Sequence, residues 1–220
     1  MATRLKIDFI SDVVCPWCII GLGGLDEALR QLDGEVEADL RFHPFELNPD
    51  MPPEGEDVAG HVARKYGATA EQSAGSRNMI RARAADVGFV INGGADSRIW
   101  NTFDAHRLLH WAGLIGAAEQ RALKMALFSA YFTDGRNICD HGVLLEVVEA
   151  AGLDAGAAAA VLGSDRYGEA VRIAEATWRQ NGINAVPTLI VEDRYVISGG
   201  QTGEVFAKAL GRIAAEKAAN

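Results

Sequence analysis

Two cysteines near the start of the chain have the type and spacing for redox chemistry. Cys15 and Cys18 enclose Pro16 and Trp17 in a C-P-W-C stretch. An apolar run over 5–10 precedes the stretch and a helical pattern begins near its end, so the pair is expected at a helix N-terminus. Unpaired backbone N–H groups and the helix dipole favour a thiolate there. Two thiols so placed form a dithiol that exchanges with other disulfides.

A metal site is the alternative use of such a pair. Structural zinc takes four ligands, often as two C-x-x-C pairs, whereas the chain has three cysteines and Cys139 stands alone. His106 and His110 share one helix face, but the glutamate of an H-E-x-x-H motif is missing. We therefore expect no metal site. Cys139 is interpreted as a small buried apolar residue, and the two histidines as polar groups at a helix surface or a substrate groove.

Composition excludes several classes of partner. The 220 residues carry a net charge of −9, without a cluster of Lys and Arg, which argues against nucleic acid or an anionic membrane. No apolar run approaches roughly 18 residues, so no transmembrane span is expected. No signal-peptide pattern precedes the first strand. The expected compartment is the cytoplasm, where a C-x-x-C pair is more often catalytic or metal-binding than structural. The sequence does not indicate an oligomeric state.

Hydrophobic periodicity predicts a strand at each end of a first helix, which is the pattern of a parallel β-α-β unit. A proline-rich loop follows, and the pattern from Asp57 to Gly182 is helical throughout. Within it, Thr69 to Gln72 is predicted to be a capping box, and Asp140 is predicted to cap a helix. A hairpin and a final helix complete the chain. The strands are predicted over 4–10, 36–43, 188–191 and 195–197, and the helices over 17–32, 97–114, 117–132, 140–151, 155–162, 165–181 and 202–217. The two ends would form one mixed sheet, built from residues 1–50 and 165–220, with residues 51–164 as a helical insertion.

Pro187 is the second informative residue. It is the only proline after Pro53 and stands directly before the strand over 188–191. A proline at the first residue of a strand is structurally permitted. Only about 5–6% of X-Pro bonds are cis, so the residues alone favour a trans bond here.

Together, these motifs resemble the thioredoxin superfamily. The segments 12–18, 44–49, 101–111 and 186–201 are similar to DsbA-like oxidoreductases, most closely to the FrnE-type branch that is grouped with 2-hydroxychromene-2-carboxylate isomerases. The resemblance spans nearly the whole chain. It implies an α/β thioredoxin fold with a large all-helical insertion between its β-α-β and β-β-α halves. It also implies a cis Val186–Pro187 bond that faces the dithiol.

The resemblance implies a cytosolic thiol–disulfide oxidoreductase that forms, reduces or rearranges disulfides. Cys15 is expected to be the exposed nucleophile and Cys18 the resolving thiol, acting on a thiol or disulfide of a protein or a small molecule. Trp17 carries no charge, so we expect a weaker oxidant than periplasmic DsbA. No cofactor is expected beyond the dithiol, with glutathione left open as a co-substrate. The residues expected at the substrate are Pro16, Trp17, Val186 and Pro187.

Two other functions stay open at this point. The first is a glutathione-dependent isomerase or transferase of the related kappa-like branch, which needs no resolving cysteine; the presence of both cysteines speaks against it. The second is a non-catalytic chaperone on the same fold. The resemblance also places Asn101 and His106 where they could touch a substrate. The aromatic residues nearby are expected in the core of the insertion: Trp100, Phe103 and Trp111.

Overall fold

The computed structural model describes residues 2–94 and 97–219 and contains one mixed four-stranded sheet. Its strand order is β2-β1-β5-β6, with β1 and β2 parallel and the other neighbours antiparallel. The strands come from the two ends of the chain, which fits the predicted mixed sheet. Their bounds are Thr3–Ser11 for β1, Val36–Pro44 for β2, Thr188–Val191 for β5 and Tyr195–Ser198 for β6.

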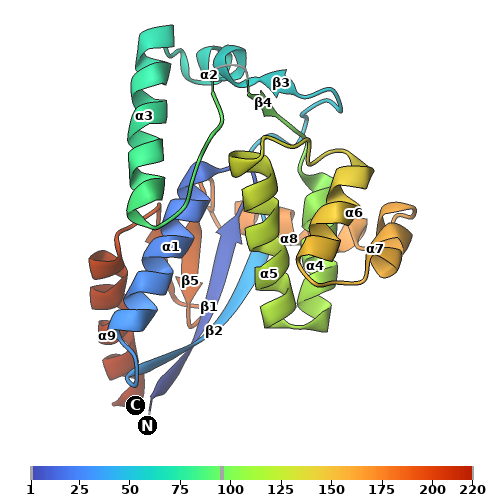
Figure 1. Cartoon of the computed structure of the whole chain (residues 1–220). Helices are drawn as coiled ribbons and strands as arrows, with labels where there is room; N and C mark the ends of the chain where they lie inside the picture. Colours follow the sequence, from blue (N-terminus) through green and yellow to red (C-terminus); the bar gives the residue numbers. More distant parts are fainter. Residues whose placement is uncertain (1, 95–96, 220) are drawn as a thin grey trace.

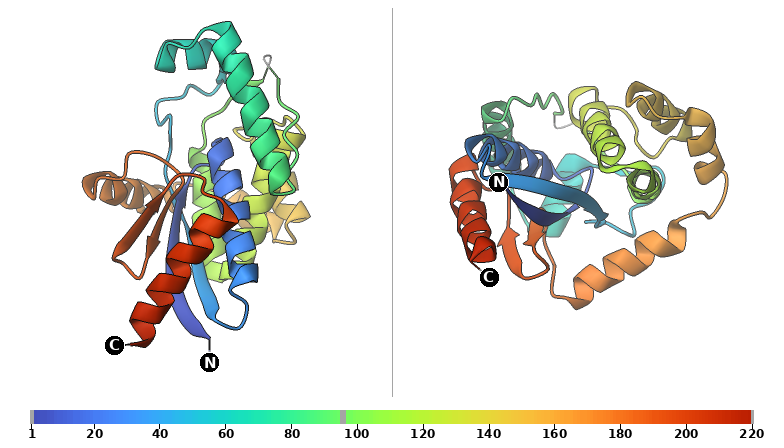
Figure 2. Two further views of the ribbon diagram at one scale, coloured as in Figure 1. Left: turned by 90° about the vertical axis from the view of Figure 1, so that its left-hand side faces the viewer. Right: turned by 90° about the horizontal axis from the view of Figure 1, so that it is seen from below.

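Two helices from opposite ends of the chain pack side by side against this sheet. Helix α1 (Pro16–Gln31) connects β1 to β2, and α9 (Gly203–Ala218) follows the hairpin. Figures 1 and 2 show the pair together, with the two termini near one another at the same end of the molecule. Their apolar faces and the sheet enclose one buried cluster, with α1 contributing residues such as Leu22 and Leu25 and α9 contributing Phe206 and Leu210.

The insertion forms the rest of the molecule. Helices α4 to α7 lie beside the sheet, whereas α2 and α3 lie at the end opposite the termini (Figures 1 and 2). The helix caps follow the sequence: the Thr69–Gln72 capping box opens α3 and Asp140 caps α6, both as predicted. The helices after the first are α2 (Val58–Tyr66), α3 (Ala70–Asp86), α4 (Phe103–Ile115), α5 (Ala117–Phe128), α6 (His141–Ala150), α7 (Ala155–Leu162) and α8 (Gly168–Gln180).

The insertion is not helical throughout, which corrects the prediction. Strands β3 (Glu56–Asp57) and β4 (Arg98–Ile99) form an antiparallel pair, so α4 begins at Phe103 rather than near 97. The Arg98 guanidinium donates to the backbone oxygens of Glu54 and Gly55, at 2.7 and 3.0 Å. Two residues are too few to show the alternating apolar pattern of a strand, so this pair is defined only by its tertiary contact. A π-helix over 129–133 also follows α5 directly.

A side chain of the insertion bonds to the edge of the sheet. The Gln120 amide of α5 accepts from the Phe42 backbone N–H at 3.0 Å and donates to the Phe42 carbonyl at 2.9 Å. It thereby replaces a neighbouring strand along β2, whose backbone groups would otherwise lack partners at this point. The domain limits at 50/51 and 164/165 stay a prediction.

Two apolar clusters meet near the C-P-W-C stretch. Phe128 and Phe132 of the insertion belong to the cluster beneath the sheet, and Val13 belongs to the cluster of the insertion. The stretch therefore lies where the two parts of the fold join. Among the helices of the described residues, none has the length and apolar character needed to cross a bilayer.

Candidate active site

The dithiol lies where β1 leads into α1. Cys15 is the N-cap residue of α1 with extended backbone angles, and Pro16 occupies the first helical position, where no N–H is needed. The Cys18 amide donates to the Cys15 carbonyl at 3.0 Å, which starts the helix at the dithiol. Both thiols are free. No acidic residue lies in the first turn, so the helix dipole is available to a thiolate.

The predicted partner segment from the other end of the chain reaches this site. The Val186–Pro187 bond is cis, the isomer that the resemblance implied. The Cys15 Sγ lies 3.5 Å from the Val186 carbonyl oxygen. The approach requires a glycine, because a Cβ added to Gly21 would lie 2.8 Å from Pro187 Cγ. Residues 15–18 and 186–187 thus form one site, with Pro16 and Trp17 half-buried beside it.

The expectation that Cys15 is exposed is wrong. Its relative accessibility is 3%, and that of Cys18 is zero. Cys15 shares a buried apolar cluster with Phe128 and Phe132, which come from the insertion. The local sequence indicated only a helix N-terminus, whereas the covering side chains are more than one hundred residues away.

A buried carboxylate behind the dithiol was not predicted. Asp12 is fully buried; its Oδ1 lies 3.2 Å from His106 Nε2 and its Oδ2 accepts from the Leu47 N–H at 2.8 Å. Burial raises the pKa of Asp12, but the hydrogen bond and charge of His106 and the Leu47 N–H outweigh it, so the net pKa is lowered. His106 is therefore not a surface residue, as one interpretation had it; it holds Asp12.

A buried ammonium group was missed as well. Lys124 of α5 has no exposed surface, and its Nζ lies 4.9 Å from the Phe128 ring centroid. Burial lowers the pKa of Lys124 to about 8, against the charges of Cys18, Asp12 and Cys15. The only sequence signal was a lysine within the apolar run Ala-Leu-Lys-Met-Ala-Leu-Phe. A lysine in such a run more often extends to the surface.

The two cysteines differ in their surroundings. Burial is the main cause that raises the pKa of Cys18 well above its usual value, followed by its hydrogen bond with Cys15 and the charge of Cys15. The charge of Lys124 and a backbone hydrogen bond at Asp12 act in the opposite direction. Cys18 is thus an enclosed thiol held in its protonated form.

The loop after β2 is held against Asp12 by a second buried carboxylate. The Glu46 carboxylate pairs with Arg172, and its backbone N–H donates to Glu175 Oε1 at 2.9 Å. Burial and the charge of Glu175 raise the pKa of Glu46 to about 8, although Arg172 opposes the shift. The Arg179 guanidinium donates to the Glu46 carbonyl at 2.7 Å. These contacts place Leu47, and with it the hydrogen bond to Asp12.

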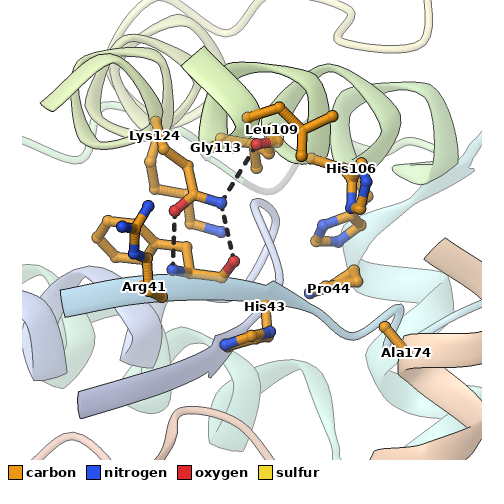
Figure 3. Close-up of a pocket in the computed structure, with 12 residues that line it drawn as sticks. Arg41, His43, Pro44, His106, Leu109, Gly113, Lys124 and Ala174 are labelled. Atoms are coloured by element: carbon orange, nitrogen blue, oxygen red, sulfur yellow. Dashed lines mark hydrogen bonds between the residues drawn. The ribbon is translucent and has the colours of Figure 1, made fainter. Parts of the chain in front are cut away.

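A cavity of about 250 Å³ lies between β2 and helices α4, α5 and α8. Figure 3 shows Lys124 and His106 extending toward β2 from the helices, while His43 extends away from them. The His43 Nε2 lies 2.7 Å from Asp8 Oδ1. His110 lines the same cavity, and burial lowers its pKa. Within the described residues, no three His, Cys, Asp or Glu side chains are grouped as metal ligands.

The other residues singled out in the sequence lie in the insertion, where they pack or form hydrogen bonds within the fold. Cys139 is partly exposed rather than buried, and burial and nearby carboxylates raise its pKa. The Asn101 side chain donates to the Met51 carbonyl at 3.1 Å and accepts from the Phe103 N–H at 2.9 Å. Trp111 is buried in the insertion core, whereas Trp100 and Phe103 are half-buried.

Comparisons with known proteins agree with this geometry. The chain is 34% identical to a probable DsbA oxidoreductase from Streptomyces coelicolor, with a TM-score of 0.85 over 94% of this chain and 89% of that one. It is 29% identical, over 96% of each chain, to the uncharacterized protein YwbO of Bacillus subtilis. A cytosolic disulfide reductase from Pseudomonas aeruginosa, in a structure with GSH, shares the fold at 21% identity, with a TM-score of 0.58 over 93% of this chain and 96% of that one.

One family model matches almost the whole chain. Residues 6–211 match the DSBA-like thioredoxin domain, a range that includes both cysteines, the cis-proline and the whole insertion. The chain therefore belongs to the DSBA-like thioredoxin family of oxidoreductases.

Proposed function

We propose that this protein is a thiol–disulfide oxidoreductase in which Cys15 is the nucleophile and Cys18 the resolving thiol. The observation that carries the proposal is the pairing of the two chain ends: the dithiol at the N-terminus of α1 faces Val186, with Cys15 Sγ 3.5 Å from its carbonyl oxygen. A thiol at this place has the helix dipole in front of it and a backbone segment beside it. The dipole favours the thiolate, and the backbone at Val186 is proposed to pair with a substrate segment beside the reacting sulfur.

The proposed reaction has two exchange steps. The Cys15 thiolate attacks one sulfur of a substrate disulfide; that S–S bond breaks, and the other substrate sulfur leaves as a thiolate and takes up a proton. Cys18 then loses its proton and attacks Cys15 Sγ, which releases the second substrate thiol and forms the Cys15–Cys18 disulfide. The substrate is reduced by two electrons and the enzyme is oxidised by two. The reverse sequence oxidises a substrate dithiol.

The burial of the two sulfurs supports this division of roles. Cys18 has no accessible surface, whereas Cys15 retains a small one and sits at the helix start. An external disulfide therefore meets Cys15 first, and Cys18 reacts only with a sulfur already attached to Cys15. The half-buried Pro16 and Trp17 and the backbone at Val186 are proposed as the substrate contacts.

We also propose that the protein works in the cytoplasm as a moderate redox couple. Trp17 adds no positive charge beside Cys15, so the reduction potential should lie below about −120 mV, the value for DsbA. Glutathione is a proposed co-substrate; the Pseudomonas aeruginosa relative is described as a cytosolic disulfide reductase with GSH. Equilibration with glutathione buffers measures the potential, and a value near that of DsbA would contradict this part of the proposal.

The function itself is tested by trapping. Cys18→Ala should react with DTNB or with a protein disulfide as fast as the wild type but retain the mixed disulfide on Cys15. Cys139→Ala is the matched control and should turn over normally, because Cys139 lies in the insertion. If the protein is instead a glutathione-dependent isomerase, Cys18→Ser should leave its turnover intact, because that reaction needs no resolving cysteine. Insulin reduction that is equal in wild type and Cys15→Ser would instead favour a non-catalytic chaperone.

A further inference from the structure

Two buried carboxyl groups, those of Glu46 and Glu175, share one cation. The Arg172 Nη1 contacts Oε2 of Glu46 and lies 3.2 Å from Oε2 of Glu175, so one nitrogen atom holds both oxygens close together. Glu46 has no exposed surface and Glu175 almost none, whereas nearly half of the Arg172 side chain is exposed. The Glu46 Oε1 has no hydrogen-bond partner among the described residues. Two ionised carboxylates would leave an uncompensated negative charge in this buried site, which is costly.

The neighbouring elements bring other charged groups close to Glu46. On α8, the Arg179 guanidinium donates to the backbone carbonyl of Glu46 at 2.7 Å, not to its carboxyl group. On α2, Lys65 Nζ donates to the backbone carbonyl of the next residue at 3.0 Å. Asp12, which follows β1, adds a further negative charge, and His106 of α4 is already bonded to Asp12. Within the part of the chain that the structure describes, the Glu46 carboxyl therefore has a single ion-pair partner, the guanidinium that it shares.

Two carboxyl groups and one guanidinium are balanced in charge when the carboxyl groups keep one proton between them. Burial and the charge of Glu175 raise the pKa of Glu46 to about 8, against the charge of Arg172. Carboxyl groups this close titrate as a pair, so the proton belongs to both of them rather than to one. At neutral pH the site then holds one carboxylate, one carboxylic acid and one guanidinium, which leaves it without net charge.

The same two residues attach the loop after β2 to α8. The Glu46 backbone N–H donates to Glu175 Oε1 at 2.9 Å, and the N–H of the next residue, Leu47, donates to Asp12 Oδ2 at 2.8 Å. Glu175 thus accepts a hydrogen bond from the loop backbone and also carries the charge that faces the Glu46 carboxyl. Repulsion between the two carboxylates would therefore act directly on the attachment of the loop.

We propose that the Glu46–Glu175 pair is a pH-sensitive attachment of the loop over 45–48: one shared proton keeps the loop bonded to α8 and to Asp12, and its loss at alkaline pH releases the loop. The inference rests on the proposed function and deepens it, because it names a regulation of the dithiol site. The step is a proton transfer only. The pair gives one proton to solvent and gains one negative charge, and no bond to sulfur forms or breaks. Both glutamates are positioning residues.

The first test follows the loop by amide hydrogen exchange of the full chain, measured by mass spectrometry on peptides that cover 45–48 and corrected for the intrinsic pH dependence of exchange. Protection in the wild type should be constant up to a pH of about 8 and then fall about tenfold per pH unit, because opening requires the loss of one proton. Glu46→Gln keeps the shape of the side chain without an ionisable proton and should stay protected throughout. Glu204→Gln, at an exposed position of α9, is the control and should follow the wild type.

The second test separates a shared proton from a merely structural contact. Carbon-13 NMR of protein labelled at the glutamate carboxyl groups follows the titration of Glu46. Because the charge of Glu175 raises the pKa of Glu46 and that of Arg172 lowers it, Glu175→Gln should move this titration to lower pH and Arg172→Gln to higher pH. A wild-type Glu46 that titrates near 4.5, its ordinary value, would overturn the inference. Loop protection that does not change with pH in the wild type would overturn it as well.

Neither measurement uses the thiols, which separates this inference from the proposed function. If the loop stays protected at alkaline pH while Cys15 forms a mixed disulfide with DTNB, only the role of the Glu46–Glu175 pair is wrong. If Cys15 forms no mixed disulfide, the proposed function fails, whatever the loop does.

Discussion

The two sides of the α1 N-terminus are built in different ways. On the side of Cys15, the surroundings are the Val186 carbonyl, the start of α1 and a buried apolar cluster that includes Phe128 and Phe132. On the side of Cys18, the thiol is fully enclosed, and the charge of Lys124, from the insertion, and a backbone hydrogen bond at Asp12 both act to lower its pKa. The surroundings of Cys15 are therefore set mainly by backbone positions and packing, whereas those of Cys18 include a buried charge.

The difference indicates how each side should respond to change. Backbone geometry does not titrate, so the reactivity of Cys15 should be sensitive to steric substitutions such as those at Gly21. Buried charges do titrate, so the state of Cys18 and the stability of the insertion should depend on pH. Each of the following substitutions addresses one side and leaves the other as its reference.

The largest effect is expected from the loss of the nucleophile. Cys15→Ala should lower the rate of mixed-disulfide formation by about a thousandfold or more, because the only remaining thiol of the pair is enclosed. The measurement is the rate of thionitrobenzoate release from DTNB in a Cys139→Ala background, because the partly exposed Cys139 thiol would also react. Comparable reactivity in Cys15→Ala would mean that Cys18 is reached directly, which would remove the distinction between the two sides.

Lys124→Met should change stability in a pH-dependent manner. Burial lowers the pKa of Lys124 from 10.5 to about 8 in the folded protein. Between these values the unfolded chain binds more protons, so the free energy of unfolding of the wild type rises with pH there. The variant should be more stable than the wild type near neutral pH, by on the order of 3 kcal/mol.

The advantage of Lys124→Met should shrink as the pH rises through this window and be small above it. Urea unfolding at a series of pH values measures the difference. A stability difference that stays constant with pH would show that packing, rather than the buried charge, separates the two proteins.

Gly21→Ala tests the steric side. The added Cβ would lie 2.8 Å from Pro187 Cγ and 3.3 Å from Gly200 Cα, so we expect a loss of about 1–3 kcal/mol in the free energy of unfolding. Gly75→Ala is the matched control, since it lies within α3 with open space around its Cβ position. That control should gain about 0.5–1 kcal/mol from helix propensity. The same sign for both variants would contradict the close approach of α1 to the segment 186–187.

Gln120→Ala should give the smallest effect. It removes the side chain that pairs with both backbone groups of Phe42. The cost should be about 1–2 kcal/mol, because the adjoining cavity admits water to the groups left behind. The rate of DTNB reaction at Cys15 should not change. A slower reaction would show that the β2 edge also shapes the side of Cys15.

Much of the fold is readable from local patterns. The alternation of strands and helices at the two ends, the Thr69 capping box and the Asp140 cap all follow rules that act within a few residues, and the structure confirms them. The β3–β4 pair and the late start of α4 were missed because two-residue strands have no periodicity. The role of His106 was missed for a similar reason: a histidine on a helix face does not reveal that its partner is Asp12, 94 residues away.

The sequence by itself determined the reactive group: two cysteines flanking Pro16 and Trp17 at the start of a helix, and a proline before a late strand. These features depend on local chemistry and on the helix N-terminus that the same residues create. Only the tertiary structure decided that both thiols are enclosed and that Cys18 shares its surroundings with Asp12 and Lys124. The physical reason is that burial and charge compensation depend on which distant elements pack together, and no local pattern records that α5 lies behind the dithiol.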